Sequence, residues 1–328
     1  MAANLAALLG NVSVALAQGA WAPKDDMMAQ REALVASMVR DKIYVMGGTS
    51  PLGRLATVEQ YSPVTDTWVP KKDMPTARQG LAACVVNGLI YAIGGIGDPE
   101  GGKAGDQFLQ TIEVYDPATD KWDGLEPMLT GRHSIVSGSA QGKAYVMGGG
   151  AGGGVVFAQN EEYDPEEDSW SDRAAMITPK ASASAAVVDG KIYVIGGYIV
   201  GGSPSDTVEA YNAEDDSWDV KASMPDERAV HASVAVNGKI YVFGGLDAGG
   251  VPIATGAVYD PRLDKWTPID AMPGPRGSLA ADAVNGRIYA FGGWDNKALK
   301  TVEAFDTGFR AVEPRGRLAT TWGVLRAE

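Results

Sequence analysis

The sequence predicts an all-β fold, a six-bladed β-propeller of four-stranded antiparallel blades closed by the N-terminal strand. Three observations support this prediction: a Gly-Gly pair that recurs six times, a hairpin signal before each pair, and a Tyr and a Trp at regular distances after it. The second glycines are Gly48, Gly95, Gly149, Gly197, Gly245 and Gly293, separated by 47, 54, 48, 48 and 48 residues. Repeats of about 40 to 50 residues with alternating apolar residues and turn signals are typical of propellers rather than of separate domains.

The composition agrees with this fold and excludes several classes of partner. The 328 residues include 42 Gly and 18 Pro, which suits many short strands joined by tight turns. The net charge of −13 produces a field that repels phosphate backbones, so we expect no nucleic acid partner. Polar residues dilute the apolar N-terminal run, so we expect no membrane span. The single cysteine, Cys84, cannot form an internal disulfide.

Each repeat opens with a basic residue and a run of small and apolar side chains. The basic residues are Arg31, Arg78, Arg132, Lys180, Arg228 and Arg276. Nine residues further on stand Arg40, Asn87, Gln141, Asp189, Asn237 and Asn285, and all but the first precede glycine. Asn-Gly and Asp-Gly supply the positive φ angles of a type I′ turn. The runs before and after each turn are therefore predicted to form a hairpin.

The later strands of each repeat follow from the same register. The second strand is rich in β-branched and aromatic residues, as in 43–45, 192–194 and 288–290, and ends in the Gly-Gly pair. The third strand carries Tyr61, Tyr115, Tyr163, Tyr211, Tyr259 or Phe305. A turn then leads to Trp68, Trp122, Trp170, Trp218 or Trp266, which begins the fourth strand.

The spacing also predicts how the ring closes. The sixth repeat should place a Trp near residue 314, but Pro314 stands there. Counting 47 residues back from Trp68 reaches Trp21, which is followed by Met27 and Arg31 in the order seen in the other repeats. We therefore expect residues 21–31 to supply the outer strand of blade six. The propeller is predicted over 21–310, with blades beginning near 31, 78, 132, 180, 228 and 276, followed by an extension over 311–328.

The double glycine, the later Tyr and the Trp at fixed distance after it resemble the kelch repeat, from Trp21 onward. The resemblance implies that the loop after each glycine pair and the residues after each basic residue face one common mouth. It implies a binding or interaction module for a protein, peptide or glycan, with no cofactor. A sugar isomerase or mutarotase using the central pocket is the alternative, and assembly into a larger array through the N-terminal arm is a third. We favour a binding module over an enzyme and assign no catalytic residue, and we leave the oligomeric state open.

The register assigns six candidate ligand-binding residues to this mouth: Glu32, Arg54, Gln79, His133, Tyr198 and Trp294. Tyr198 and Trp294 lie two blades apart and suit the walls of a pocket for an apolar or sugar-like face. They also suit the simpler role of capping their blades. Arg54 is a candidate because the other blades lack Arg near that place, and a solvated loop charge is its alternative.

Two further residues are channel candidates because they interrupt an apolar register. His231 aligns with Leu34, Leu81, Ile135, Ala183 and Leu279, and a satisfied core histidine is its alternative role. Asp282 aligns with Ser37, Cys84, Gly138, Ala186 and Val234. A carboxylate there needs a hydrogen-bonding partner or channel water, so its alternative role is a link to a neighbouring blade.

Two segments lie outside the regular repeat. Blade two has 20 residues from Gly95 to Tyr115 where the others have 12 to 14, and its Asp98, Glu100 and Asp106 do not match a calcium loop. We expect no metal there and a partner-contacting loop instead. Residues 1–20 are expected to be a signal peptide or an N-terminal arm, because residues 1–23 lack charge and Ala15-Leu16-Ala17 has the form of a cleavage site. Export, secreted or periplasmic, is the favoured localisation, and a cytoplasmic location is left open.

Overall fold

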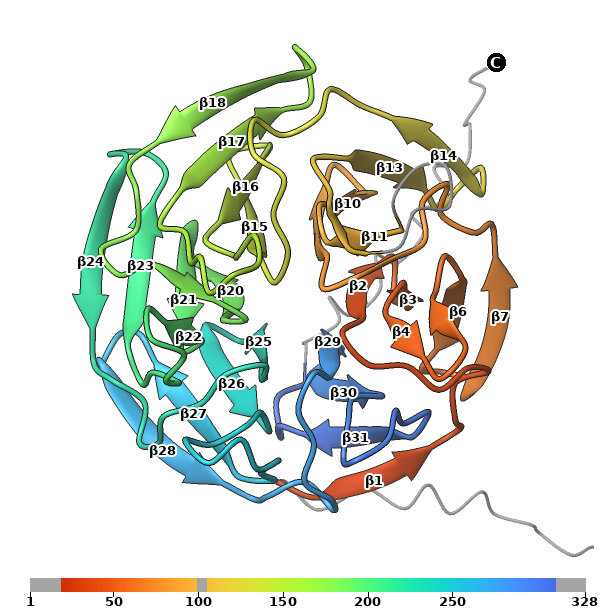
Figure 1. Ribbon diagram of the computed structural model, residues 1–328. Helices are drawn as coiled ribbons and strands as arrows, with labels where there is room; N and C mark the ends of the chain where they lie inside the picture. Colours follow the sequence, from red (N-terminus) through yellow and green to blue (C-terminus); the bar gives the residue numbers. More distant parts are fainter. Residues whose placement is uncertain (1–18, 99–104, 311–328) are drawn as a thin grey trace, which may run out of the picture.

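Six four-stranded antiparallel sheets form a ring in the computed structural model, which describes residues 19–98 and 105–310 (Figure 1). This confirms the predicted six-bladed, all-β propeller. Within the described part of the chain there is no helix long and apolar enough to cross a membrane. Residues 1–18 of the predicted signal peptide or N-terminal arm (1–20), Glu100 and the C-terminal extension (residues 311–328) lie outside the described residues.

The strands of each blade follow in order from the axis outward. Blade one contains β2 (Val35–Val39), β3 (Lys42–Met46), β6 (Val58–Ser62) and β7 (Thr67–Lys71). Blade two contains β9 (Ala82–Val86), β10 (Leu89–Ile93), β13 (Ile112–Asp116) and β14 (Lys121–Gly124). Blade three contains β15 (Val136–Ala140), β16 (Lys143–Met147), β17 (Asn160–Asp164) and β18 (Ser169–Arg173).

The other three blades repeat this order. Blade four contains β20 (Ser184–Val188), β21 (Lys191–Ile195), β23 (Val208–Asn212) and β24 (Ser217–Lys221). Blade five contains β25 (Ala232–Val236), β26 (Lys239–Phe243), β27 (Gly256–Asp260) and β28 (Lys265–Ile269). Blade six contains β29 (Ala280–Val284), β30 (Arg287–Phe291), β31 (Val302–Asp306) and β1 (Trp21–Lys24). Short strands in the loops are β4 (Thr49–Ser50), β5 (Gly53–Arg54), β8 (Arg78–Gln79), β11 (Ile96–Gly97), β12 (Gln107–Phe108), β19 (Lys180–Ala181) and β22 (Tyr198–Ile199).

The strand register places all six post-glycine loops on one face of the ring. In blade one, Val35 pairs with Met46, Met46 with Val58, and Val58 with Lys71, so these four strand ends share one end of the sheet. The post-glycine loop and the connection to the next blade both start there. We call this side of the ring the mouth face, and the side that carries the hairpin turns the far face.

The hairpin turns have the geometry that the sequence predicts. Asn87 and Gly88 have φ angles of 51° and 80°, as a type I′ turn requires. Arg40 and Asp41 adopt φ angles of 50° and 60° in blade one, although neither is glycine. The register of the hairpin therefore holds in all six blades, including the one without a glycine in the turn.

The N-terminal strand closes the ring, as the spacing predicts. β1 pairs antiparallel with β31, with Trp21 opposite Phe305 and Lys24 opposite Val302. Figure 1 shows the red strand β1 beside the blue strand β31. The Trp21 ring lies 5.0 Å from that of Phe243 and 5.1 Å from that of Phe305, so it also packs blade six against blade five.

Neighbouring blades are joined by a polar contact that recurs around the Tyr and Trp positions of the repeat. In blade two, the Tyr115 hydroxyl donates to Asp120 (2.6 Å), which also accepts the backbone N–H of Lys72 (2.9 Å). The Trp122 indole N–H donates to the Lys72 carbonyl (2.9 Å). Lys72 belongs to the connection that leaves blade one, so each such contact ties the outer edge of one blade to the chain that enters it.

The basic residue that opens each repeat is buried and holds the glycine turn. Arg78 donates to the carbonyls of Gly94 (3.2 Å) and Thr111 (3.0 Å) and forms an ion pair with Glu113 (2.5 Å). The equivalent ion pairs are Arg31–Glu59, Arg132–Glu161, Lys180–Glu209 and Arg276–Glu303. Because these side chains are buried and paired, their role is structural. They place the next residue along the chain at the mouth.

Six backbone hydrogen bonds form a closed circle around the axis at the mouth face. Each N–H donates to the carbonyl of the corresponding residue in the preceding blade, at 2.7–2.9 Å. The six residues, which we call the axial belt, are Ala33, Gly80, Ser134, Ser182, Val230 and Ser278. All six have φ between 50° and 59°, which turns their amides toward the neighbouring blade.

Candidate functional site

The mouth face brings together the two sets of residues that the repeat register pointed to. In each blade, the residue after the buried basic position pairs with the residue after the glycine pair. The six pairs are Glu32 with Thr49, Gln79 with Ile96, His133 with Gly150, Ala181 with Tyr198, Ala229 with Leu246, and Gly277 with Trp294. The polar side chains Glu32, Thr49, Gln79 and His133 therefore lie on blades one to three, and the side chains at these positions on blades four to six are aromatic or apolar.

A hollow of about 740 Å³ opens between the loops of blades three and four. His133 and Tyr198 both line it, so the structure brings these two candidates together. Its other side chains come from Val155, Val156, Ile199, Ala181, Ser134 and Ser182, and glycine backbone lines the rest. Glu32, Arg54, Gln79 and Trp294 are not among its lining residues.

The imidazole of His133 is held between two blades. Its ring stacks on Phe108 with 5.1 Å between centroids and an interplanar angle of 21°. Its Nδ1 lies 2.9 Å from Ser134 Oγ. Burial lowers the pKa of His133, so the imidazole is neutral at pH 7. A neutral stacked ring offers ligands an apolar face and a single polar nitrogen.

Phe108 is a site residue that the sequence reasoning missed. It lies in β12, within the insertion of blade two, and pairs with Ile96. A Cβ added to Gly152 would lie 2.8 Å from the Phe108 ring, so only glycine lets the loop of blade three approach this closely. The insertion has no counterpart in the other repeats, and its extra length was the only signal in the sequence.

Tyr198 forms the opposite side of the hollow on blade four. It begins β22, which pairs with β19 through Ala181 and Tyr198. Burial raises the pKa of its phenol, which stays protonated and can donate a hydrogen bond. Gly201 and Gly202 beside it have positive φ angles and line the same hollow, exposing backbone rather than side chains to a ligand.

Arg54 holds the insertion of blade two rather than standing free at the mouth. Its guanidinium forms ion pairs with Asp98 and Asp106, which flank the insertion, and only 16% of its side chain is exposed. These ion pairs occupy Asp98 and Asp106, the two aspartates that the sequence analysis compared with a calcium loop. Among residues 19–98 and 105–310, no group of three or more His, Cys, Asp or Glu side chains could hold a metal ion.

Trp294, Glu32 and Gln79 lie at other points of the mouth. Trp294 is half-buried and bridges Gly277 and Ala298 in blade six, across the ring from blade three. Glu32 is half-buried in blade one, and burial raises the pKa of its carboxyl. Gln79 pairs with Ile96 at the start of blade two. The structure therefore does not place Trp294 and Tyr198 on a shared hollow.

His231 lies at the axis as a buried link between two blades. Its side chain is 5% exposed, and its Nε2 lies 2.7 Å from Ser184 Oγ of blade four. Burial lowers the pKa of His231 well below its usual value, so the ring is neutral. It lines a small hollow of about 110 Å³ next to the axial belt.

Asp282 lies in the middle of the inner strand β29 and contacts blade one. Its carboxylate accepts the backbone N–H of Met38 (2.7 Å) and that of Ala283 (2.7 Å). Burial raises the pKa of Asp282 to about 6. The contact with Met38 is the link to a neighbouring blade that was the alternative role of Asp282, and Asp282 also lines a hollow of about 430 Å³ along the axis.

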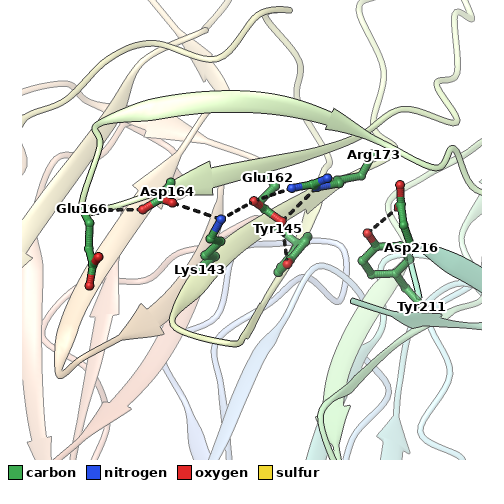
Figure 2. A network of polar contacts seen from close by, with 8 residues as sticks. All are labelled: Lys143, Tyr145, Glu162, Asp164, Glu166, Arg173, Tyr211 and Asp216. Atoms are coloured by element: carbon green, nitrogen blue, oxygen red, sulfur yellow. Dashed lines mark hydrogen bonds and ion pairs between the residues drawn. The ribbon is translucent and has the colours of Figure 1, made fainter. Parts of the chain in front are cut away.

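Another cluster of charged side chains lies in blade three, away from the mouth hollow (Figure 2). Glu162 accepts hydrogen bonds from Lys143 (2.8 Å), Tyr145 (2.7 Å) and Arg173 (2.8 and 2.9 Å). Both carboxylate oxygens are occupied by protein donors. This network therefore stabilises the blade and leaves Glu162 no free oxygen for a ligand.

Comparisons with known proteins agree with this architecture. The family model described as Kelch motif matches residues 32–75 and 77–129, and the KLHDC2/KLHL20/DRC7 Kelch-repeats domain model matches residues 132–312. A solved structure titled "Structure of YjhT" is similar with a TM-score of 0.73 and 18% sequence identity, over 84% of this chain and 94% of that chain. This likeness concerns the fold alone. No curated protein matches the chain.

Proposed function

The chain belongs to the kelch-repeat family, and from this premise we propose that it is a binding module whose mouth face takes up an extended segment of a partner protein. Kelch domains generally mediate protein binding, which supports this class of partner. The observation that carries the proposal is the hollow between blades three and four, with His133 and Tyr198 on its sides.

The hollow suits an apolar side chain of a peptide. Its volume of about 740 Å³ lies within the range of about 300–1,000 Å³ common for ligand sites. Valine, isoleucine, tyrosine and glycine backbone line it, so a peptide gains apolar burial and backbone hydrogen bonds there. Apolar side chains also stand exposed in other loops of this face, as at Leu52 (99%), Val200 (68%) and Val251 (56%). Such exposed apolar groups favour a protein surface as the partner.

The charge of the mouth face favours a basic segment. Exposed and half-buried carboxylates clearly outnumber the accessible cations in the described parts of its loops. The carboxylates are Asp26, Glu32, Asp73, Asp98, Asp106, Asp206, Asp226, Glu227, Asp247 and Asp295, and the cations are Arg54, Lys297 and Lys300. Arg54 and Lys300 are themselves paired with carboxylates. A partner segment with Lys or Arg beside its apolar side chain is thereby attracted and oriented.

Selection from a random peptide library displayed on phage tests this proposal. We expect the selected peptides to combine an aromatic or aliphatic residue with Lys or Arg. Their affinity, measured by fluorescence anisotropy, should fall about tenfold or more in Tyr198→Ala, which is about 1.4 kcal/mol. His133→Ala should weaken it similarly, whereas Leu263→Ala in an exposed turn of the far face should leave it unchanged. Raising the salt concentration should weaken binding because the attraction is partly electrostatic.

Two outcomes would overturn the proposal in favour of its alternatives. Binding to a glycan array, with no peptide enriched and with losses in Tyr198→Ala and Trp294→Ala, would make the protein a glycan binder. Turnover of a sugar that is lost in His133→Ala or Glu32→Ala while binding is retained would make it an enzyme of the mutarotase type.

A further inference from the structure

We propose that Arg54 is a positioning residue of the peptide site: it holds the insertion of blade two in the path that places Phe108 against His133. This inference rests on the proposed function of the mouth face, because it concerns the shape of the same hollow. Arg54 is not among the lining residues of that hollow. It acts from blade one on a ring in blade three, and the connection consists of two ion pairs, the register of a short hairpin and a ring stack.

Arg54 joins the two strands of the insertion at the point where their pairing ends. β11 and β12 are paired up to Gly97 and Gln107. Asp98 and Asp106 are the next residues along these strands, and the Arg54 guanidinium forms an ion pair with each of them, an arrangement that we call the Arg54 clamp. Like charges opposite each other destabilise a pair of strands. The clamp therefore offsets a repulsion that would open this hairpin.

The burial of the guanidinium distinguishes the Arg54 clamp from an ordinary surface ion pair. Salt bridges between exposed side chains contribute little, because water screens them. Only 16% of the Arg54 side chain is exposed, whereas the side chains of Asp98 and Asp106 are 72% and 53% exposed. Loss of Arg54 would leave two unpaired carboxylates beside each other. It would also remove a mostly buried side chain from the contact between blades one and two.

Phe108 carries this constraint to blade three. It lies two residues after Asp106, so the Arg54 clamp fixes the start of the strand that carries its ring. The ring stacks on His133 with 5.1 Å between centroids. It also contacts the loop of blade three, since a Cβ added to Gly152 would lie 2.8 Å from it. Gly152 and His133 both line the hollow, so the position of Phe108 determines where this wall stands.

The stack also determines which part of His133 faces a ligand. Phe108 stacks on the imidazole, and Ser134 Oγ lies 2.9 Å from Nδ1. The other nitrogen, Nε2, is directed toward Gly150 of the hollow, where an added Cβ would lie 3.6 Å from it. A peptide therefore meets a ring that is already oriented, which reduces the cost of ordering it on binding. Loss of the Arg54 clamp should lower affinity without removing any atom from the hollow.

NMR of the free protein with isotope-labelled histidine tests the first step. The chain has two histidines, so the ring protons of His133 are identified by their absence in His133→Ala. The Phe108 ring current should shift these protons upfield, and Phe108→Ala should abolish that shift. Arg54→Met should remove at least half of it at about pH 8, where the imidazole is neutral. Arg262→Met, in an exposed turn of the far face, is the matched control and should leave the shift unchanged.

A charge-relieving variant separates the Arg54 clamp from a general loss of folding. Adding Asp98→Asn to Arg54→Met removes the repulsion between the two strands and should restore part of the upfield shift. Affinity for the selected peptides should fall by a factor of about three to ten in Arg54→Met. The same substitution made in Phe108→Ala should cause little further loss, because Arg54 acts through Phe108.

Three results would each overturn the proposal. These are an upfield shift that persists in Arg54→Met, a shift that Asp98→Asn does not restore at all, and an affinity loss from Arg54→Met that is equally large in Phe108→Ala. If no peptide is selected, the proposed function fails instead, and the ring shifts still decide whether Arg54 positions His133.

Discussion

Glu162 shows how hydrogen bonds and nearby charges can outweigh burial at a single side chain. Burial of the carboxylate opposes its ionisation, but hydrogen bonds from Arg173, Lys143 and Tyr145 outweigh burial and lower the pKa of Glu162 to about 2. The folded state therefore binds this proton less readily than the unfolded state, whose Glu has a pKa near 4.3. The resulting stabilisation is complete above the unfolded pKa and is lost as the pH falls toward 2.

Glu162→Gln should lower the free energy of unfolding by about 1–3 kcal/mol at neutral pH, because it leaves Lys143 and Arg173 without their carboxylate. Urea unfolding followed by tryptophan fluorescence measures this loss. The difference from wild type should stay constant above about pH 5.5 and shrink between about pH 4.5 and 2. Glu214→Gln, in an exposed turn, is the control and should show neither effect. A loss that is independent of pH would contradict the role of the Glu162 charge.

Single residues also show where sequence reasoning about the site ends. The register identified His133 and Tyr198 as mouth residues, and the structure brings them to one hollow. It could not identify Phe108, since contact between Phe108 and His133 depends on the path of an insertion that no other blade repeats. Likewise, Arg54, Asp98 and Asp106 each stand out in the sequence, but their pairing follows only from the packing of blade one against blade two.

Among the structural elements, blade five is the exception to the buried ion pair. Blade five has Ala257 where each of the other five blades has a Glu. In four of those blades the Glu pairs with an Arg, and in blade four Glu209 pairs with Lys180 (3.1 Å). Arg228 instead pairs with Asp226 (3.2 Å), whose side chain is 60% exposed. The buried basic residue is therefore paired with a buried carboxylate in blade four and with a solvent-exposed carboxylate in blade five.

This difference predicts unequal effects of two matched substitutions. Glu209→Gln should cost about 3–5 kcal/mol, because it leaves the buried Lys180 ammonium without a counter-charge. Asp226→Asn should cost less than about 1 kcal/mol, because water already screens that pair. Urea midpoints of the two variants measure the difference. Equal losses would show that burial of the carboxylate does not determine the strength of this contact.

The elements themselves were largely predictable, because their signals are local. Turn residues such as Asn87-Gly88, and the alternation of small and apolar residues in the inner strands, specify each hairpin without reference to other blades. The axial belt was not predictable, because it is formed by backbone groups of residues as different as Gly80 and Val230. No pattern of side chains marks a contact that any residue with that φ can make.

At the scale of the whole molecule, ring closure depends on a strand from the beginning of the chain. β1 provides the outer edge of blade six, and Trp21 also donates its indole N–H to the Asp270 carbonyl of the connection from blade five (3.1 Å). The spacing of the repeats predicted this closure, because the sixth repeat lacks its Trp and the N-terminal segment has a Trp at the matching position. Opening the ring requires this strand to leave both neighbours.

We propose that the protein is exported and that cleavage after Ala17 leaves Gln18 as the first residue, which keeps β1 intact. The mass of the exported protein, measured after expression in a host that processes signal peptides, should correspond to residues 18–328. A protein beginning at Gln18 should unfold at the same urea midpoint as the full chain. One beginning at Asp25 should lose at least about 3–5 kcal/mol, since removing Trp21 alone deletes a large packed side chain.

Two results would contradict this pair of expectations. Recovery of an unprocessed chain that still begins at Met1 would favour a retained N-terminal arm. An unchanged urea midpoint after removal of residues 1–24 would show that β1 does not contribute to the stability of the ring.

The axial belt has a consequence for how the mouth attracts charge. Six peptide groups follow one another head to tail around the axis, and in such a circle the tangential components of their dipoles cancel. The amides at the mouth therefore do not act like the first turn of a helix, where aligned N–H groups create a positive pole that draws anions. Because the axial belt adds no such positive pole, the carboxylate side chains of the mouth face determine which charge it attracts in a ligand, and that charge is positive.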